Sequence, residues 1–210
     1  MNQEVFWSNR YKDAGDEYLF GTEPNHFLAS KAHLFTANQK ALSLGDGEGR
    51  NSVWLAKNGL DVTAVEISPV AVSKAGKLAE KHSVNLHLIQ TDMLLHDWDA
   101  AALNNSFDWV IGIFIQFVGP EGRKIQFDTM KALACHGGRI LLHGYTPKQL
   151  EYKTGGPSAA ENLYTRPMLL EAFADWEIEE IIEYEDVISE GLGHNGQSAL
   201  MSMIARKPSE

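Results

Sequence analysis

Residues 41–51 read Ala-Leu-Ser-Leu-Gly-Asp-Gly-Glu-Gly-Arg-Asn. The first four are mostly apolar and predict a short buried strand. The glycines at 45, 47 and 49 predict a tight turn, because glycine adopts left-handed backbone conformations at little steric cost. The segment 51–59 predicts a helix that Gly59 closes. A strand, a glycine-rich loop and a helix in this order favour a cofactor site at the loop, where backbone N–H groups can face a ligand.

The rest of the chain alternates between strand and helix patterns. Further strands are expected at 62–67, 86–89, 107–117 and 139–143; helices are expected at 68–82, from Pro120 to the glycines at 137 and 138, and at 166–174. This alternation is typical of right-handed crossovers and a parallel sheet covered on both faces. Two strand patterns, 177–188 and 198–205, end the chain with only a glycine-rich link between them, which predicts an antiparallel hairpin. The expected fold is therefore α/β, doubly wound and Rossmann-like, with a mostly parallel seven-stranded sheet.

Composition narrows the class of protein. A length of 210 residues without repeats or Pro- and Ser-rich linkers predicts a single domain, with residues 1–37 as an N-terminal arm and helix and 38–210 as the core. The net charge of −10 argues against nucleic acid and anionic membranes as partners. The acids gathered in 175–190 are expected on a solvated sheet edge or face.

The cellular location is also suggested by the sequence. The chain has no apolar run of roughly 18 residues and no secretory signal at its start, and neither membrane spanning nor secretion is expected. The single cysteine, Cys135, cannot form an internal disulfide and is expected to pack in an apolar helix. These features predict a cytoplasmic protein.

Two acids follow the next two strands in register with the glycine loop. Glu66 ends the second strand, where a carboxylate can accept hydrogen bonds from ribose hydroxyls. Asp92 ends the third strand, where it could accept a hydrogen bond from an adenine amine. This pattern also fits NAD, but the dinucleotide fingerprint has its third glycine where this chain has Arg50. Two alternatives are kept open at this point, an NAD-linked oxidoreductase and a non-catalytic cofactor-binding module.

The stretch from about Ala41 to Lys207 resembles the class I S-adenosylmethionine-dependent methyltransferases. Within that superfamily it is similar to the small bacterial enzymes akin to tellurite-resistance and thiopurine methyltransferases. One difference is that relatives often carry a histidine near the end of the fourth strand, where this chain has Gln116. The motifs that carry the resemblance are Leu44 to Asn51, Glu66, Thr91-Asp92-Met93, Phe107-Asp108, Leu133 to Gly138, Phe6 to Tyr11, Tyr18 to Asn25, Tyr145 to Leu150, Thr154 to Pro157 and Glu190 to Gly196.

The resemblance implies S-adenosylmethionine as cofactor and a role for each matching residue. Backbone at Gly45, Gly47 and Gly49 would face the methionine moiety, Glu66 the ribose, and Asp92 with the backbone of Met93 the adenine. A carboxylate near the cofactor's ammonium group would be favourable. The remaining residues assigned to the cofactor are Asp46 and Asn51 in the loop, and Ile67 and Ile113 as apolar walls.

The acceptor side is less defined, because methyl transfer from a sulfonium has no obligatory catalytic base. His194, Tyr145 and Gln116 are the candidates for contact with the acceptor. The aromatic residues Trp7, Tyr11, Tyr18 and Phe20 predict a lid over the cofactor. No His-x-x-x-His or Cys-x-x-Cys pair indicates a metal. We expect a methyltransferase for a small-molecule acceptor with a sulfur, selenium, tellurium or oxygen nucleophile.

Overall fold

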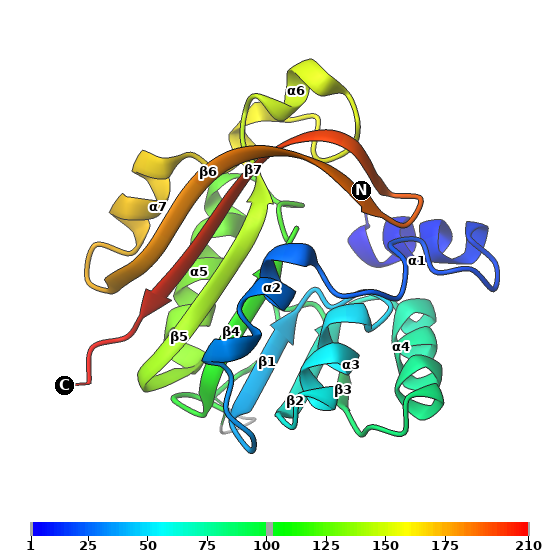
Figure 1. Cartoon of the computed structure of the whole chain (residues 1–210), viewed down its shortest axis with the longest axis horizontal. Coiled ribbons are helices and arrows are strands. Elements are labelled where there is room, and N and C mark those ends of the chain that lie inside the picture. Colours follow the sequence, from blue (N-terminus) through cyan, green and yellow to red (C-terminus); the bar gives the residue numbers. More distant parts are fainter. Residues whose placement is uncertain (1, 100–102, 210) are drawn as a thin grey trace. The chain divides into compact units, whose positions relative to one another are not determined.

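The computed structural model describes residues 2–99 and 103–209, and the chain divides into two compact units (Figure 1). The first unit is Met1–His96 together with Glu190–Gly193, and the second is Asp97–Ser189 together with His194–Glu210. The single domain expected from the sequence remains a prediction.

The first unit holds three parallel strands in the order β3-β2-β1. Ser68 begins helix α4, because its side chain accepts a hydrogen bond from the N–H of Ala71 and Pro69 occupies the first turn. Helix α3 contacts β1, β2 and α4, and α4 also contacts α1. The elements in chain order are α1 (Gln3–Asp13), α2 (His26–Ser30), the 3-10 helix η1 (Ala32–Leu34), β1 (Lys40–Leu44), α3 (Arg50–Lys57), β2 (Asp61–Glu66), α4 (Pro69–Lys81) and β3 (His87–Gln90).

The second unit holds four strands in the order β4-β5-β7-β6. Strands β4 and β5 are parallel, whereas β7 runs antiparallel to β5, and β6 forms the outer edge beside β7 (Figure 1). The elements in chain order are β4 (Phe107–Ile113), α5 (Pro120–Leu133), β5 (Ala134–Tyr145), α6 (Gln149–Tyr152), the 3-10 helix η2 (Ala160–Asn162), α7 (Arg166–Ala172), β6 (Glu177–Glu190) and β7 (His194–Arg206).

These strands confirm the expected fold class. In the described part of the chain, helices follow β1, β2, β4 and β5, the pairings β1–β2, β2–β3 and β4–β5 are parallel, and β7 pairs antiparallel with β5. The acid-rich segment lies on β6, whose residues are mostly exposed or half-buried, as the sequence predicts for a solvated edge. Among the described residues, no helix combines the length and the apolar character that crossing a membrane requires.

Three expectations about element boundaries are wrong. The fourth strand stops at Ile113, because Phe114 has a left-handed φ of 55°. The helix from Pro120 ends at Leu133, and the strand that follows bulges through its glycines, where the β4–β5 register shifts. Cys135 therefore lies on β5 rather than in a helix, half-buried, with its sulfur 3.9 Å from a carboxylate oxygen of Asp108.

The closing hairpin also differs from the expectation. Its two strands are longer than predicted and leave only residues 191–193 between them. His194 is therefore the first residue of β7 rather than part of a loop.

Candidate cofactor and acceptor sites

Two glycines of the loop after β1 have different structural reasons for lacking a side chain. A Cβ on Gly49, whose φ is +92°, would lie 2.8 Å from Cα and Cβ of Ala75 on α4. A Cβ on Gly47, whose φ is +63°, would approach only the phenol of Tyr11, at 3.0 Å. Gly49 therefore permits close packing on α4, whereas Gly47 permits the close approach of the Tyr11 phenol to the loop.

Glu66 connects the end of β2 to this loop. Its Oε2 accepts a hydrogen bond from the N–H of Gly47 at 2.9 Å, and its Oε1 accepts one from the N–H of Ser68 at 2.8 Å. Burial of the carboxyl group raises its pKa from 4.5 to about 7, against the lowering effect of these two N–H donors. Each carboxylate oxygen has a second lone pair, so Glu66 can still accept hydrogen bonds from a ligand's hydroxyl groups.

Asp46 holds the loop in shape. Its Oδ1 accepts a hydrogen bond from Oγ of Ser43 at 2.7 Å, and its Oδ2 accepts one from Oγ of Ser52 at 2.6 Å. Burial raises the pKa of Asp46, and the two hydroxyl donors oppose that rise. These bonds tie the loop to β1 and α3, a role that the sequence pattern does not reveal; a direct contact of Asp46 with the cofactor remains a prediction.

Asp92 and Met93 follow β3 beside the end of β2. The register pairs Glu66 with Gln90, and the N–H of Thr91 donates to the carbonyl oxygen of Glu66 at 3.0 Å. Asp92 is half-buried and accepts a hydrogen bond from the N–H of Leu94 at 2.9 Å, while Met93 is buried. The structure thus brings the predicted ribose and adenine acids to neighbouring strand ends.

The two predicted apolar walls lie in different units. Ile67, directly after Glu66, is half-buried in the first unit, and Ile113 ends β4 in the second. Their contact with the cofactor remains a prediction.

Glu48 fastens the N-terminal segment to the glycine loop. Its Oε2 accepts a hydrogen bond from the N–H of Leu19 at 2.7 Å, and its Oε1 forms an ion pair with Nζ of Lys74 at 2.8 Å. The same ammonium group donates to the carbonyl oxygens of Tyr11 and Glu17 at 2.9 and 2.8 Å. The carboxylate in the middle of the loop therefore organises the arm.

Arg50 and Asn51, next along the chain, fasten two further segments. Nη2 of Arg50 pairs with Oε2 of Glu190 at 2.7 Å, with both side chains at most 10% exposed. The other oxygen of Glu190 accepts a hydrogen bond from Nδ2 of Asn25 at 2.9 Å, and Oδ1 of Asn51 accepts one from the N–H of Asn25 at 2.8 Å. Asn51 therefore binds the N-terminal segment. Its contact with the cofactor remains a prediction. The sequence offered no sign of the ion pair, because its partners are 140 positions apart.

The predicted lid residues form an aromatic group on and after α1. The ring centroid of Trp7 lies 6.0 Å from that of Tyr11 and 6.5 Å from that of Phe20. Tyr11 is buried, and Tyr18 donates a hydrogen bond to the carbonyl oxygen of Lys74 at 3.3 Å. Burial and the nearby carboxylates of Glu66 and Glu48 raise the pKa of Tyr11 well above its ordinary value, so its phenol is a neutral donor beside the loop. Movement of this group as a lid remains a prediction.

The acceptor candidates meet around Phe114 in the second unit. The centroid of its ring lies 4.1 Å from that of His194, 4.7 Å from that of Tyr145 and 4.9 Å from that of His143. Its N–H donates to the carbonyl oxygen of His143 at 2.8 Å. A left-handed backbone costs a residue with a side chain roughly 1–2 kcal/mol, and such strained residues cluster at functional sites. The sequence did not single out Phe114, because backbone strain leaves no mark on residue type.

Gln116 has a different role from the one expected. Its Oε1 accepts a hydrogen bond from the N–H of Tyr145 at 2.6 Å, and its Nε2 donates to the carbonyl oxygens of Tyr145 and Asn162 at 2.8 and 3.3 Å. Both ends of the amide thus bind backbone. Gln116 positions the end of β5, and with it Tyr145.

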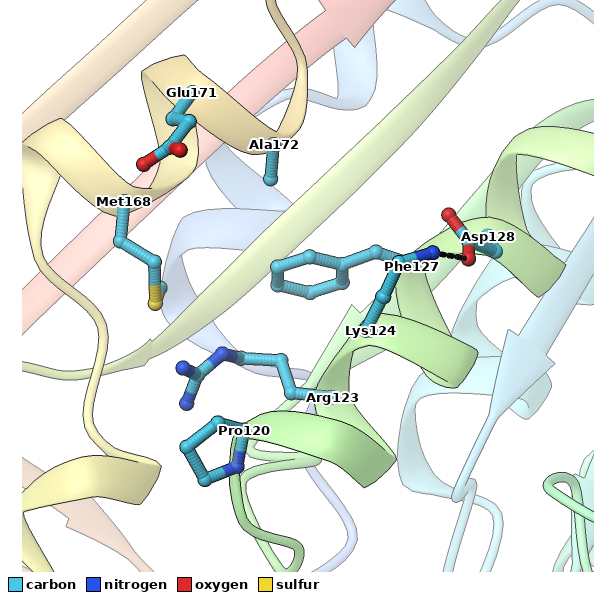
Figure 2. A pocket seen from close by; sticks show the side chains of 8 residues that line it. All are labelled: Pro120, Arg123, Lys124, Phe127, Asp128, Met168, Glu171 and Ala172. Atoms are coloured by element: carbon cyan, nitrogen blue, oxygen red, sulfur yellow. Dashed lines mark hydrogen bonds and ion pairs between the residues drawn. The ribbon is translucent and has the colours of Figure 1, made fainter.

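A separate pocket of about 280 Å³ lies between α5 and α7 in the second unit (Figure 2). Arg123 and Met168 point toward it from opposite sides, and Lys124 pairs with Asp128 at 2.5 Å (Figure 2). None of its lining residues belongs to the sites predicted from the sequence. Across residues 2–99 and 103–209, no group of three or more His, Cys, Asp or Glu side chains could hold a metal ion.

Comparison with protein families identifies the segment that carries the cofactor elements. Residues 41–138 match the family described as "Methyltransferase domain". This segment begins at β1 and includes the glycine loop, Glu66 and Asp92. The predicted cofactor residues therefore all lie within the matched segment.

Two curated proteins are similar over most of the chain. One is "Hemagglutinin 1" of Eikenella corrodens, with 27% identity over 194 residues, covering 90% of this chain and 61% of that protein. The other is "Probable S-adenosyl-L-methionine-dependent methyltransferase TehB" of Haemophilus influenzae, with 26% identity over 174 residues, covering 80% and 57%. The chain thus spans about 60% of the length of these relatives.

Solved structures share the fold. The crystal structure of TehB from Haemophilus influenzae superposes with a TM-score of 0.69 at 22% identity, covering 97% of this chain and 66% of that one. A structure named "Conversion of a Disulfide Bond into a Thioacetal Group during Echinomycin Biosynthesis" superposes with a TM-score of 0.77 at 16% identity, covering 100% and 94%. The Rossmann-like architecture predicted from the sequence is therefore that of known structures.

Proposed function

We propose that this chain is a class I S-adenosylmethionine-dependent methyltransferase that transfers a methyl group to a small-molecule acceptor with a sulfur, selenium, tellurium or oxygen nucleophile. The observation that carries the proposal is the contact between Glu66 and Gly47, which joins a buried acid at the end of β2 to the glycine loop. Similarity to TehB supports it. The alternative of an NAD-linked oxidoreductase is disfavoured by Arg50, which stands where the dinucleotide fingerprint has its third glycine.

The residues of the first unit fit S-adenosylmethionine. A Cβ on Gly47 would lie 3.0 Å from the phenol oxygen of Tyr11, so the glycine leaves space between the loop and this ring that a side chain would fill. Glu66 would accept from the ribose hydroxyls and Asp92 from the adenine amine. The carboxylate of Asp46, which is hydrogen-bonded to the neutral hydroxyl groups of Ser43 and Ser52, would favour a ligand with positive charge. When bound, the cofactor supplies a methyl group on a positively charged sulfur, which is an activated leaving group.

The residues of the second unit would hold the acceptor and its proton. Tyr145 and His194 are buried beside the ring of Phe114. The acceptor's sulfur or oxygen gains the methyl group, and its proton passes to the imidazole of His194 and on to solvent. The electron pair of the broken carbon–sulfur bond stays on the departing thioether. An acceptor that is already an anion needs no such base.

The small size of the acceptor is supported by charge. A net charge of −10 disfavours a phosphate backbone, which binds through clustered lysine and arginine. The single cysteine fits the reducing conditions of the cytoplasm, where we propose that the enzyme acts.

Calorimetry and a transfer assay test the proposal. S-adenosylhomocysteine should bind and NAD should not, and labelled methyl groups should appear on at least one member of a panel of thiols, phenols, selenite and tellurite. Binding of NAD without a response to S-adenosylhomocysteine would overturn the cofactor assignment. Binding of S-adenosylhomocysteine without transfer to any acceptor would overturn the enzymatic function and leave a cofactor-binding module.

A further inference from the structure

On the premise of the proposed function, we infer that Phe114 determines acceptor specificity: its ring covers the pair formed by His194 and Tyr145 and favours a thiol or phenol on an apolar body. Phe114 is not among the site residues predicted from the sequence, and all of its contacts described below lie within the second unit.

The geometry of the ring supports a covering role. Phe114 is half-buried, whereas His194 is 8% exposed and Tyr145 is 1% exposed. The Phe114 ring meets the imidazole of His194 edge-on, with a centroid distance of 4.1 Å and an angle of 60° between the planes. It also lies 4.7 Å from the ring of Tyr145. Phe114 therefore contacts both buried polar side chains and is the most exposed of the three residues.

The backbone of Phe114 adopts a strained, left-handed conformation. Its φ of 55° is unfavourable for a residue with a large side chain. Its N–H is fixed by the carbonyl oxygen of His143, and the two residues that follow, Ile115 and Gln116, are buried. Strain of this kind persists where the surroundings impose it. A glycine would adopt this conformation without strain. A phenylalanine at this position therefore indicates that its ring has a role beyond forming the turn.

The neighbours of the ring indicate the chemistry of the acceptor. Phe114 packs on a buried cluster of Tyr145, Leu163, Ile188 and Leu200. Aromatic and aliphatic walls favour an apolar body, and aromatic rings make favourable contacts with sulfur and with other rings. An inorganic oxyanion would lose its hydration among such groups at a considerable cost. The class that fits is therefore a thiol or phenol on an apolar body, rather than selenite or tellurite.

Kinetics with a matched set of variants tests specificity. Phe114→Ala should raise the KM for thiophenol roughly 10- to 100-fold, the range for losing an apolar contact in a specificity pocket. The KM for S-adenosylmethionine should stay within about twofold of the wild-type value, and Phe114→Tyr, which keeps the ring, should restore most of the thiophenol affinity. Equal rises in both KM values, or wild-type transfer to selenite and tellurite but not to thiols or phenols, would overturn the inference.

Two further measurements do not depend on turnover. Phe114→Ala should speed the modification of His194 by diethyl pyrocarbonate, followed by mass spectrometry, because the imidazole loses its cover. Phe114→Gly should melt roughly 2–4 °C above Phe114→Ala, since both lose the ring and only alanine keeps the strain. Unchanged labelling or equal melting temperatures would overturn the covering or strained role. If the wild-type protein binds S-adenosylhomocysteine but methylates no acceptor, the proposed function is wrong. That result can be told apart from a failure of the inference about Phe114, which the labelling and melting experiments detect.

Discussion

Replacing Glu66 by glutamine should change how the stability of the protein depends on pH. Burial raises the pKa of this carboxyl group from 4.5 to about 7. One pKa unit corresponds to about 1.4 kcal/mol, so keeping Glu66 ionised in the folded protein costs roughly 3 kcal/mol. The folded protein holds this proton at pH values where the unfolded chain has lost it. The contribution of Glu66 to stability is therefore fully present below pH 4.5 and is lost as the pH rises through about 7.

Glutamine stays neutral at every pH and removes this dependence. Its NH2 group takes the place of one of the two oxygens that accept from Gly47 and Ser68 and leaves one of these N–H groups facing a donor, so Glu66→Gln should be less stable than the wild type at low pH. The stability of Glu66→Gln relative to the wild type should rise by roughly 2–3 kcal/mol between pH 5 and pH 8, because ionisation of this group destabilises only the wild type. Urea unfolding at pH 5, 6, 7 and 8 measures this difference directly.

The control for this experiment is Glu183→Gln, which removes the same charge from an exposed position on β6. Its unfolding free energy should run nearly parallel to that of the wild type across the pH range. If the curves of Glu66→Gln and the wild type are also parallel, the buried carboxyl group does not titrate near neutral pH, and the reasoning from burial is refuted.

Three other predictions concern the ion pair, the adenine contact and the cysteine. Arg50→Met should lower the free energy of unfolding in urea by about 3–5 kcal/mol, because it leaves the carboxylate of Glu190 buried and unpaired. Adding Glu190→Gln should recover part of that loss of stability. Strictly additive losses from the two substitutions would show that the two side chains are not coupled. Asp92→Ala should weaken the binding of S-adenosylhomocysteine by about 1–3 kcal/mol in calorimetry, and an unchanged affinity would remove Asp92 from the adenine role. Burial and the charge of Asp108 raise the pKa of Cys135, so iodoacetamide at neutral pH should alkylate it more slowly than free cysteine, as mass spectrometry would show; an equal rate would contradict this prediction.

Much of the fold follows from local patterns. The strand at 40–44, the helix capped by Ser68 and the left-handed Gly59 each depend on residues within a few positions of one another, so their signals are visible in the sequence. After Leu133 the sequence predicts more helix, whereas the structure has a strand, because glycines that usually end a helix here allow a strand to bulge.

Some residues of the candidate site can be predicted from the sequence, and others are identified only by the structure. Glu66 and Asp92 stand out because acids that end successive parallel strands are recognisable from spacing alone. The sequence does not predict that Gln116 positions Tyr145. That role consists of hydrogen bonds to backbone 29 positions away along the chain. Nor does it distinguish Gly49, which meets Ala75, from Gly47, which faces Tyr11.

The sequence by itself determined the order of strands and helices, the glycine loop and the two acids that belong to it, because these depend on periodicity and on short spacings. Tertiary structure alone decided which charged residues hold the loop and which could meet a ligand. Glu48 and Arg50 lie in the loop's own sequence, yet their charges are neutralised by Lys74 and Glu190. A buried charge must find a partner wherever the fold brings one close, and that distance in space is set by packing rather than by position along the chain.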